Sequence, residues 1–331
     1  METKKEIGIQ TFGEPSQAGT IGDPVSVEDE NGRTWQNYKP DKYFLPNDDG
    51  EQDRLDVTHK GFCIQVHSLQ DPQTRSKNPD DALHLAPIEG DPPRVLDLGT
   101  GTGIWAIEYA RRHPGSEVIG SDLSLIQPDV SATVPNVSFV REDVEDYWVH
   151  GAPFDFIHGR LLFTCFDNHK DVIKKAFDSL RPGGWIEYQD SSLNVDSDDN
   201  SHRRTALHKL TYLSMAGAAA MGRDLEVARK YKDYFIEAGF VDVVEVKFKV
   251  FGNTWPEKEP DYTIGKYMSL SGSQVIKTIS EKLLRKGLVL PEDIIEPIVL
   301  QALKDVNNTQ IHLWWPGYVV YGRKPFDHEK S

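Results

Sequence analysis

Arg94-Val-Leu-Asp-Leu-Gly-Thr-Gly-Thr-Gly-Ile-Trp-Ala-Ile-Glu-Tyr-Ala110 is the stretch that decides the fold. It opens with a short apolar run suited to a buried strand, followed by alternating glycines and threonines. Apolar residues then recur at Ile104, Ile107 and Ala110, the spacing of one helix face. The stretch therefore predicts a strand, a glycine-rich turn and a helix. Such a turn lets a ligand approach the main chain beside the unpaired N–H groups of the helix N-terminus.

The glycine spacing restricts the kind of ligand. Gly99, Gly101 and Gly103 form G-x-G-x-G, whereas the dinucleotide fingerprint requires G-x-G-x-x-G, and no Lys-Ser or Lys-Thr follows to make a Walker loop. Asp97, two residues before the first glycine, disfavours phosphate and suits a cationic or hydroxyl-rich ligand. This D-x-G-x-G-x-G pattern resembles motif I of class I S-adenosylmethionine (SAM) methyltransferases. The alternative is a tight turn that binds no ligand.

Composition and charge exclude several classes of partner. The chain has 331 residues and a formal net charge of −15 at pH 7, which argues against sequence-independent nucleic-acid binding and against an anionic membrane surface. Its two cysteines, Cys63 and Cys165, indicate neither a metal site nor a disulfide framework. There is no apolar leader and no apolar run of about 18 residues. We expect a soluble protein of the cytoplasm or the nucleus.

Strands and helices alternate after the opening stretch, which predicts an α/β fold with a parallel sheet. Further strands are expected at residues 117–122, 136–141, 154–158 and 185–189. In such sheets ligands bind beyond the carboxyl ends of the strands. Polar residues gather at those ends: Asp97, Asp122, Asp143, His158 and Asp190.

The remaining chain predicts a cap over these strand ends. Residues 1–40 are polar and are expected to form a flexible N-terminal segment, before a single domain over 41–331. Helical patterns lie within about 41–70, 192–226 and 252–310. The last interval is too long for a plain loop in a compact domain. We expect these segments to form a helical cap.

Longer segments resemble the fungal LaeA-like methyltransferases. The resemblance is carried by residues 95–105, 117–124, 126–128, 135–137, 143–146, 154–160, 180–187 and 189–190, and also by 51–59, 311–312 and 318–325. It implies a class I, Rossmann-like methyltransferase fold, with a seven-stranded sheet closed by an antiparallel strand near 318–322. The family includes regulators of secondary metabolism and development as well as tailoring enzymes of biosynthetic clusters.

The resemblance implies SAM as cofactor, with S-adenosylhomocysteine as product. Gly99, Thr100, Gly101 and Gly103 are expected around its methionine and ribose, and Asp97 near its ammonium group.

Acids at the next two strand ends are expected to hold the nucleoside. Asp122 would accept the ribose hydroxyls, unless it caps a short helix. Asp143 would accept the adenine amino group beside the Val144 amide, unless it is a solvated loop acid. Leu123 would pack on adenine or belong to the core.

His158 is the leading titratable candidate. A histidine there can act as a base toward the acceptor, contact the cofactor, or bond only to the backbone. Asp190 is the second candidate base. Arg160 would pair with the SAM carboxylate or with Asp155, and His59 would close over the cofactor or simply pack against the core.

Three function classes stay open. The first is methyl transfer to an O, N or C nucleophile of a small secondary metabolite, which depends mainly on positioning and on exclusion of water. The second is a LaeA-like regulatory protein with a protein partner or a homodimeric form. The third is a SAM-binding fold that catalyses a rearrangement without methylation. The sequence shows no metal-ligand pattern.

Overall fold

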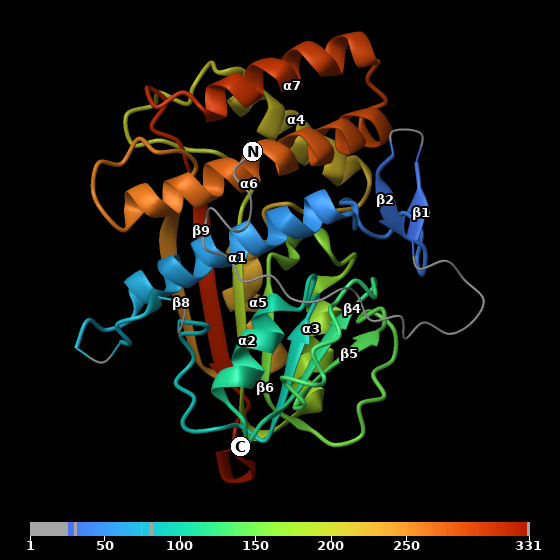
Figure 1. The fold of residues 1–331 in the computed structure, drawn as a ribbon, viewed down its shortest axis with the longest axis vertical. Coiled ribbons are helices and arrows are strands. Elements are labelled where there is room, and N and C mark those ends of the chain that lie inside the picture. Colours follow the sequence, from blue (N-terminus) through green and yellow to red (C-terminus); the bar gives the residue numbers. More distant parts are fainter. Residues whose placement is uncertain (1–25, 30–31, 74, 80–81, 330–331) are drawn as a thin grey trace.

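The computed structural model describes residues 26–29, 32–73, 75–79 and 82–329, and its centre is a seven-stranded sheet (Figure 1). The strands of this sheet are β3 (Arg94–Leu98), β4 (Glu117–Asp122), β5 (Val137–Arg141), β6 (Phe154–Arg160), β7 (Leu180–Ser191), β8 (Val241–Phe251) and β9 (Trp314–Arg323). Their order is β5-β4-β3-β6-β7-β9-β8. Neighbours from β5 to β7 run parallel, whereas β9 is antiparallel to both β7 and β8. The predicted fold class, including its antiparallel last strand, is confirmed.

Helices cover both faces of the sheet because alternate residues of the buried strands point to opposite sides. Val95 packs with α2 (Ile104–Arg112) in one core cluster. Leu96 and Leu98 pack in a second cluster with α3 (His169–Ser179) and α5 (Tyr231–Ala238). β3 is therefore buried on both faces, as its apolar run predicts.

Four further helices pack beyond the carboxyl ends of the strands, from the middle to the top of the view in Figure 1. They are α1 (Asp49–Leu69), α4 (Ala206–Ala220), α6 (Asp261–Lys282) and α7 (Glu292–Val306). Apolar side chains of α4, α6 and α7 form their own core cluster, which includes Leu210, Ile279 and Val299. The sequence pattern predicts separate helical stretches near 264–270 and 275–286, whereas α6 runs without a break between them. In the described part of the chain, no helix combines the length and apolar character needed to cross a bilayer.

A small hairpin precedes this body. β1 (Ser26–Glu28) pairs antiparallel with β2 (Thr34–Gln36). Asn47 ties the hairpin to the body, because its amide N–H donates to the Thr34 carbonyl at 2.7 Å and its side chain lies 3.4 Å from Ser124 Oγ. We expected residues 1–40 to form a flexible segment, so this hairpin was not predicted. Residues 1–25 and 30–31 lie outside the described part of the chain.

Candidate functional site

A cavity of about 220 Å³ lies between the strand ends and the helices α1 and α6. Of the residues expected at a site, the cavity wall includes His59, Asp97, Gly99, Thr100, Gly101, Asp122, Leu123, Asp143, Val144, His158 and Arg160. Gly103 and Asp190 do not belong to that wall. The topology therefore brings together side chains that are up to about 100 positions apart in the sequence.

The glycine turn places its backbone against the cavity. Gly99 and Gly101 have φ values of +61° and +59°, a conformation that residues with a Cβ rarely adopt. A Cβ at Gly101 would contact Leu55 of α1 at 3.4 Å. Gly103 has a different task, since a Cβ there would lie 2.6 Å from the Phe139 ring. Gly103 therefore permits close packing behind the turn.

Asp122 caps the glycine turn from the end of β4. Its two carboxylate oxygens accept the backbone N–H groups of Gly101 and Ser124, each at 2.9 Å. Burial raises the pKa of Asp122 to about 6. Residues 123–136 contain no helix in the structure, so the alternative of a helix cap does not apply. Asp122 is a partly buried acid at the edge of the cavity.

Asp143 is held by two lysines from the segment before α1. Its Oδ2 lies 3.2 Å from Lys42 Nζ and 3.7 Å from Lys39 Nζ. The Glu145 amide donates to the other oxygen at 2.9 Å. Because its side chain is only 4% exposed, the alternative of a solvated loop acid is wrong. Lys42 has no sequence signal, since its contacts are all with distant segments.

His158 and Asp97 form a buried pair across β6 and β3, where they are register partners. His158 Nδ1 lies 2.7 Å from Asp97 Oδ1, and Thr100 Oγ1 donates to the other oxygen at 2.6 Å. The imidazole stacks on Trp105 with a centroid distance of 3.7 Å and an interplanar angle of 2°. Burial lowers the pKa of His158. The neutral ring donates from Nδ1, so Nε2 carries a lone pair, and it has no hydrogen-bond partner among the described residues.

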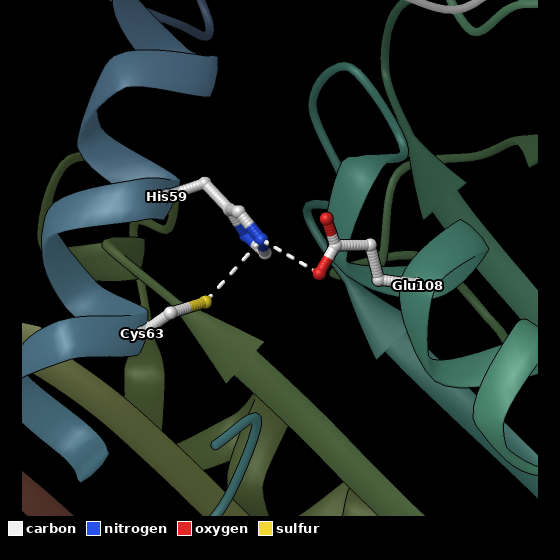
Figure 2. Close-up of side chains that lie close together, drawn as sticks. All are labelled: His59, Cys63 and Glu108. Atoms are coloured by element: carbon white, nitrogen blue, oxygen red, sulfur yellow. Dashed lines mark hydrogen bonds and ion pairs between the residues drawn. The ribbon is translucent and has the colours of Figure 1, made fainter. Parts of the chain in front are cut away.

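A second polar cluster joins the buried His59 and Cys63 to the partly buried Glu108 and Arg160. Arg160 Nη2 donates to His59 Nδ1 at 2.7 Å. On the other side of the ring, Nε2 lies 3.4 Å from both Cys63 Sγ and Glu108 Oε2 (Figure 2). Asp155 does not contact Arg160; it pairs with Arg181 and accepts the Arg94 amide at 2.8 Å. The expected alternative partner for Arg160 is therefore excluded.

Comparison with known proteins identifies the family. A family model described as a methyltransferase domain matches residues 72–246. The methyltransferase pytC of Aspergillus terreus is 30% identical over 305 residues, which span 90% of this chain and 88% of that protein. The chain belongs to the methyltransferase family.

Two further matches are a relative in sequence and a solved structure. Protein-methionine methyltransferase laeA of Emericella nidulans is 31% identical to this methyltransferase, over 90% of this chain and 76% of that protein. A solved phosphoethanolamine N-methyltransferase 2 of Haemonchus contortus, in complex with S-adenosylhomocysteine, is 16% identical with a TM-score of 0.47. That match covers 85% of this chain and 61% of the other. The family model and the sequence relatives thus confirm the resemblance to LaeA-like proteins, the enzyme class and the cofactor SAM.

The residues of this methyltransferase fit a SAM molecule. The glycine turn presents backbone to the cavity, and the partly buried Asp122 carboxylate lies beside it. A guanidinium, that of Arg160, faces the same space and forms no ion pair with a described carboxylate. SAM carries hydroxyl groups, an ammonium group and a carboxylate, for which these groups are suitable partners.

Asp190 lies outside the cavity of the methyltransferase. Its Oδ2 accepts the Tyr231 hydroxyl at 2.8 Å, and Oδ1 accepts the Ser191 amide at 2.8 Å. Burial raises the pKa of Asp190 to about 7. The Asp190 carboxylate is thus enclosed between β7 and α5, while Ser191 and Ser192 line the cavity in its place.

The cap side of the cavity is apolar. Its wall includes Phe163, Phe166, Leu193, Met268, Val275, Ile276, Ile279 and Trp315. Adjacent residues of a strand point to opposite faces. Trp315 accordingly lines the cavity, whereas Trp314 donates from Nε1 to Asp198 at 3.2 Å. Arg54 is the cation contributed by α1, and Glu51 pairs with it at 2.6 Å.

Proposed function

We propose that this chain transfers a methyl group from SAM to an O, N or C nucleophile of a small secondary metabolite bound in the cavity. When bound, SAM supplies a methyl group that its sulfonium already activates. The observation that carries the proposal is the cavity itself, which joins a polar wall at the strand ends to an apolar wall under the cap.

The polar wall would hold the cofactor. Asp122 is suited to the ribose hydroxyls, and Asp143 with the Val144 backbone to the adenine edge. Gly99, Thr100 and Gly101 leave room for the chain of the ligand along the turn. Arg160 is suited to a carboxylate, and the free Nε2 lone pair of His158 to an ammonium group.

The apolar wall would hold the acceptor. Aromatic and aliphatic side chains from α6, the 161–166 segment and β9 favour an uncharged molecule with a large apolar surface. They also exclude water from the reacting atoms, which in-line methyl transfer requires along with correct orientation. Asp190 is then a structural acid. The one lone pair of His158, on Nε2, would be used by the ammonium group, so we assign His158 to the cofactor and not to proton transfer from the acceptor.

Isotope-labelled transfer tests the proposal. The full chain is incubated with methyl-labelled SAM and a fungal metabolite extract, and products are separated by mass spectrometry. We expect a labelled small molecule that is one methylene unit heavier than its precursor. A regulatory protein would give label on protein or none, and a rearrangement would give a product of unchanged mass; each of these results would contradict the proposal.

A further inference from the structure

The position of Arg160 depends on an imidazole. Its Nη2 donates to His59 Nδ1 at 2.7 Å, and its guanidinium carbon lies 5.6 Å from the centre of the Phe62 ring. No described carboxylate forms an ion pair with Arg160. Burial lowers the pKa of Arg160, yet a guanidinium stays charged at neutral pH. A partly buried cation in this state is available for an anionic ligand that enters the cavity.

The direction of the hydrogen bonds follows from the donors. A guanidinium has N–H donors and no acceptor, so His59 Nδ1 must accept. Burial opposes protonation of His59, yet its neighbours Cys63 and Glu108 raise the pKa of the ring overall. A hydrogen bond from Arg160 to Nδ1 nevertheless requires the neutral ring. Its proton is then on Nε2, which lies 3.4 Å from Glu108 Oε2 and 3.4 Å from Cys63 Sγ. Figure 2 shows the imidazole between the carboxylate of α2 and the thiol of α1. The ring can hold Arg160 only in this tautomer.

Glu108 supplies the anion that favours this tautomer. Burial opposes its ionisation, but the hydrogen bond from His59 and the charges of Arg112 and Lys60 lower the pKa of Glu108 overall. Arg112 Nη1 lies 3.2 Å from the same Oε2 atom. Two acceptors lie beside Nε2, the Glu108 carboxylate and the Cys63 sulfur. The carboxylate is the stronger acceptor, because hydrogen bonds to ionised groups are about twice as strong as neutral ones.

The same three side chains have the spacing of metal ligands, since their ligand atoms all lie within 4.8 Å of one another. A metal ion on Nε2 would replace the proton there. Histidine ligands normally donate their second ring N–H to an acceptor. Here the second nitrogen faces the donor Arg160, so a metal would require an anionic ring. The geometry favours hydrogen bonding over metal binding.

We propose that Glu108 is a positioning residue, which fixes the His59 tautomer and thereby holds Arg160 for the carboxylate of SAM. The inference rests on the proposed cofactor site and adds Glu108, which no sequence pattern selects. It assigns Glu108 no contact with the cofactor. Loss of Glu108 should therefore weaken only the interaction that Arg160 makes.

Two ligands separate this role from a general structural one. Isothermal titration calorimetry on the full chain compares S-adenosylhomocysteine with 5′-methylthioadenosine, which keeps the adenosine and thioether but lacks the amino-acid part. Glu108→Ala should lower the affinity for S-adenosylhomocysteine about tenfold and change the affinity for 5′-methylthioadenosine by less than about twofold. Glu108→Gln keeps an oxygen acceptor and should recover most of the loss. Glu117→Ala removes an exposed carboxylate and is the matched control.

A double substitution completes the test. Arg160→Gln alone should lower the affinity for S-adenosylhomocysteine. Adding Glu108→Ala should lower it no further, because both changes remove the same interaction. Additive losses, or equal losses for both ligands, would overturn the role of Glu108. Zinc binding to chelator-treated protein that disappears in Cys63→Ala would also overturn it in favour of a metal site. If the wild-type chain binds neither nucleoside, the cofactor site itself fails, which is a distinguishable result.

Discussion

The two walls of the cavity are built by different means. Charged side chains in the strand-end wall are each held by identified bonds: Asp97 by His158 and Thr100, and Asp122 by two backbone amides. The cap wall is formed by side chains such as Val275 and Ile276, which are held by packing. Directional bonds fix a charge to within fractions of an ångström, whereas packing fixes shape and leaves chemistry open.

This difference separates two tasks. A ligand rich in charges and hydroxyl groups needs fixed partners, and strands joined by a regular ladder provide them. An apolar acceptor needs a dry space of suitable shape, which helices can alter through a few side chains. The comparison implies that substitutions in one wall should change one affinity and leave the other unchanged.

Substitution of Asp190 tests whether this acid lies outside the strand-end wall. It should give the largest effect, which is a change in the free energy of unfolding. Its pKa is raised from an ordinary 3.8 to about 7, so between these values the folded chain holds a proton that the unfolded chain has lost. The stability that Asp190 contributes is complete below pH 4 and falls as the pH rises to 7, by up to about 1.4 kcal/mol for each pH unit.

Urea unfolding of the wild type and Asp190→Asn between pH 4 and 8 measures this contribution. The unfolding free energy of the wild type minus that of Asp190→Asn should fall as the pH rises to about 7 and should then stay constant. Asp198→Asn, at an exposed position, is the control. A flat difference for Asp190→Asn would indicate a solvated acid and return Asp190 to the candidate bases.

Asp122→Ala should impair the strand-end wall, which is proposed to bind the cofactor, and leave the cap wall intact. We expect about a 100-fold loss of affinity for S-adenosylhomocysteine, because a buried carboxylate that bonds to hydroxyl groups contributes about 1.5–3 kcal/mol. Calorimetry measures this loss. Asp129→Ala removes an exposed acid from the same loop and should have no effect. Unchanged affinity in Asp122→Ala would contradict the assignment of this wall.

Much of the cofactor wall could be predicted from the sequence because its signals are local. The apolar run of β3, the alternating glycines and the acid that ends each strand are each recognised within a segment of a few residues. The fold then brings the ends together, since parallel strands terminate at one edge. Asp190 has the same local signal, and only the packing of α5 against β7 shows that its carboxylate is enclosed.

The cap and the supporting contacts could not be predicted in this way. The sequence Ser269-Leu-Ser-Gly-Ser273 suggests a break, yet α6 continues through it. Ser271 is satisfied across the helix interface by Thr58 at 2.6 Å and Arg54 at 3.1 Å. His59 and Arg160 are 101 positions apart. Such contacts depend on tertiary structure, for which a single sequence carries no periodic signal.

Val275→Asp should affect the acceptor wall and leave the cofactor wall intact. Val275 is only partly buried and lines the cavity, so the charge would face the acceptor. We expect KM for an identified acceptor to rise about tenfold, because an apolar surface would meet an unpaired carboxylate. The affinity for S-adenosylhomocysteine should stay within about twofold. Ile294→Asp, on the exposed face of α7, is the control. A parallel loss of both affinities would show that the two walls are coupled.

Lys42→Met should give the smallest effect and sharpen the comparison within the cofactor wall. Lys42 Nζ lies 2.7 Å from Glu145, 3.2 Å from Asp143 and 3.2 Å from Asp167. Lys39, at 3.7 Å from Asp143, should compensate in part, so we expect about a threefold loss of cofactor affinity. Calorimetry at low and high salt measures the loss, which should shrink as salt screens the acids. Lys39→Met is the control and should have less effect, since its side chain is 38% exposed. A tenfold loss that is independent of salt would mean that Lys42 contacts the ligand directly.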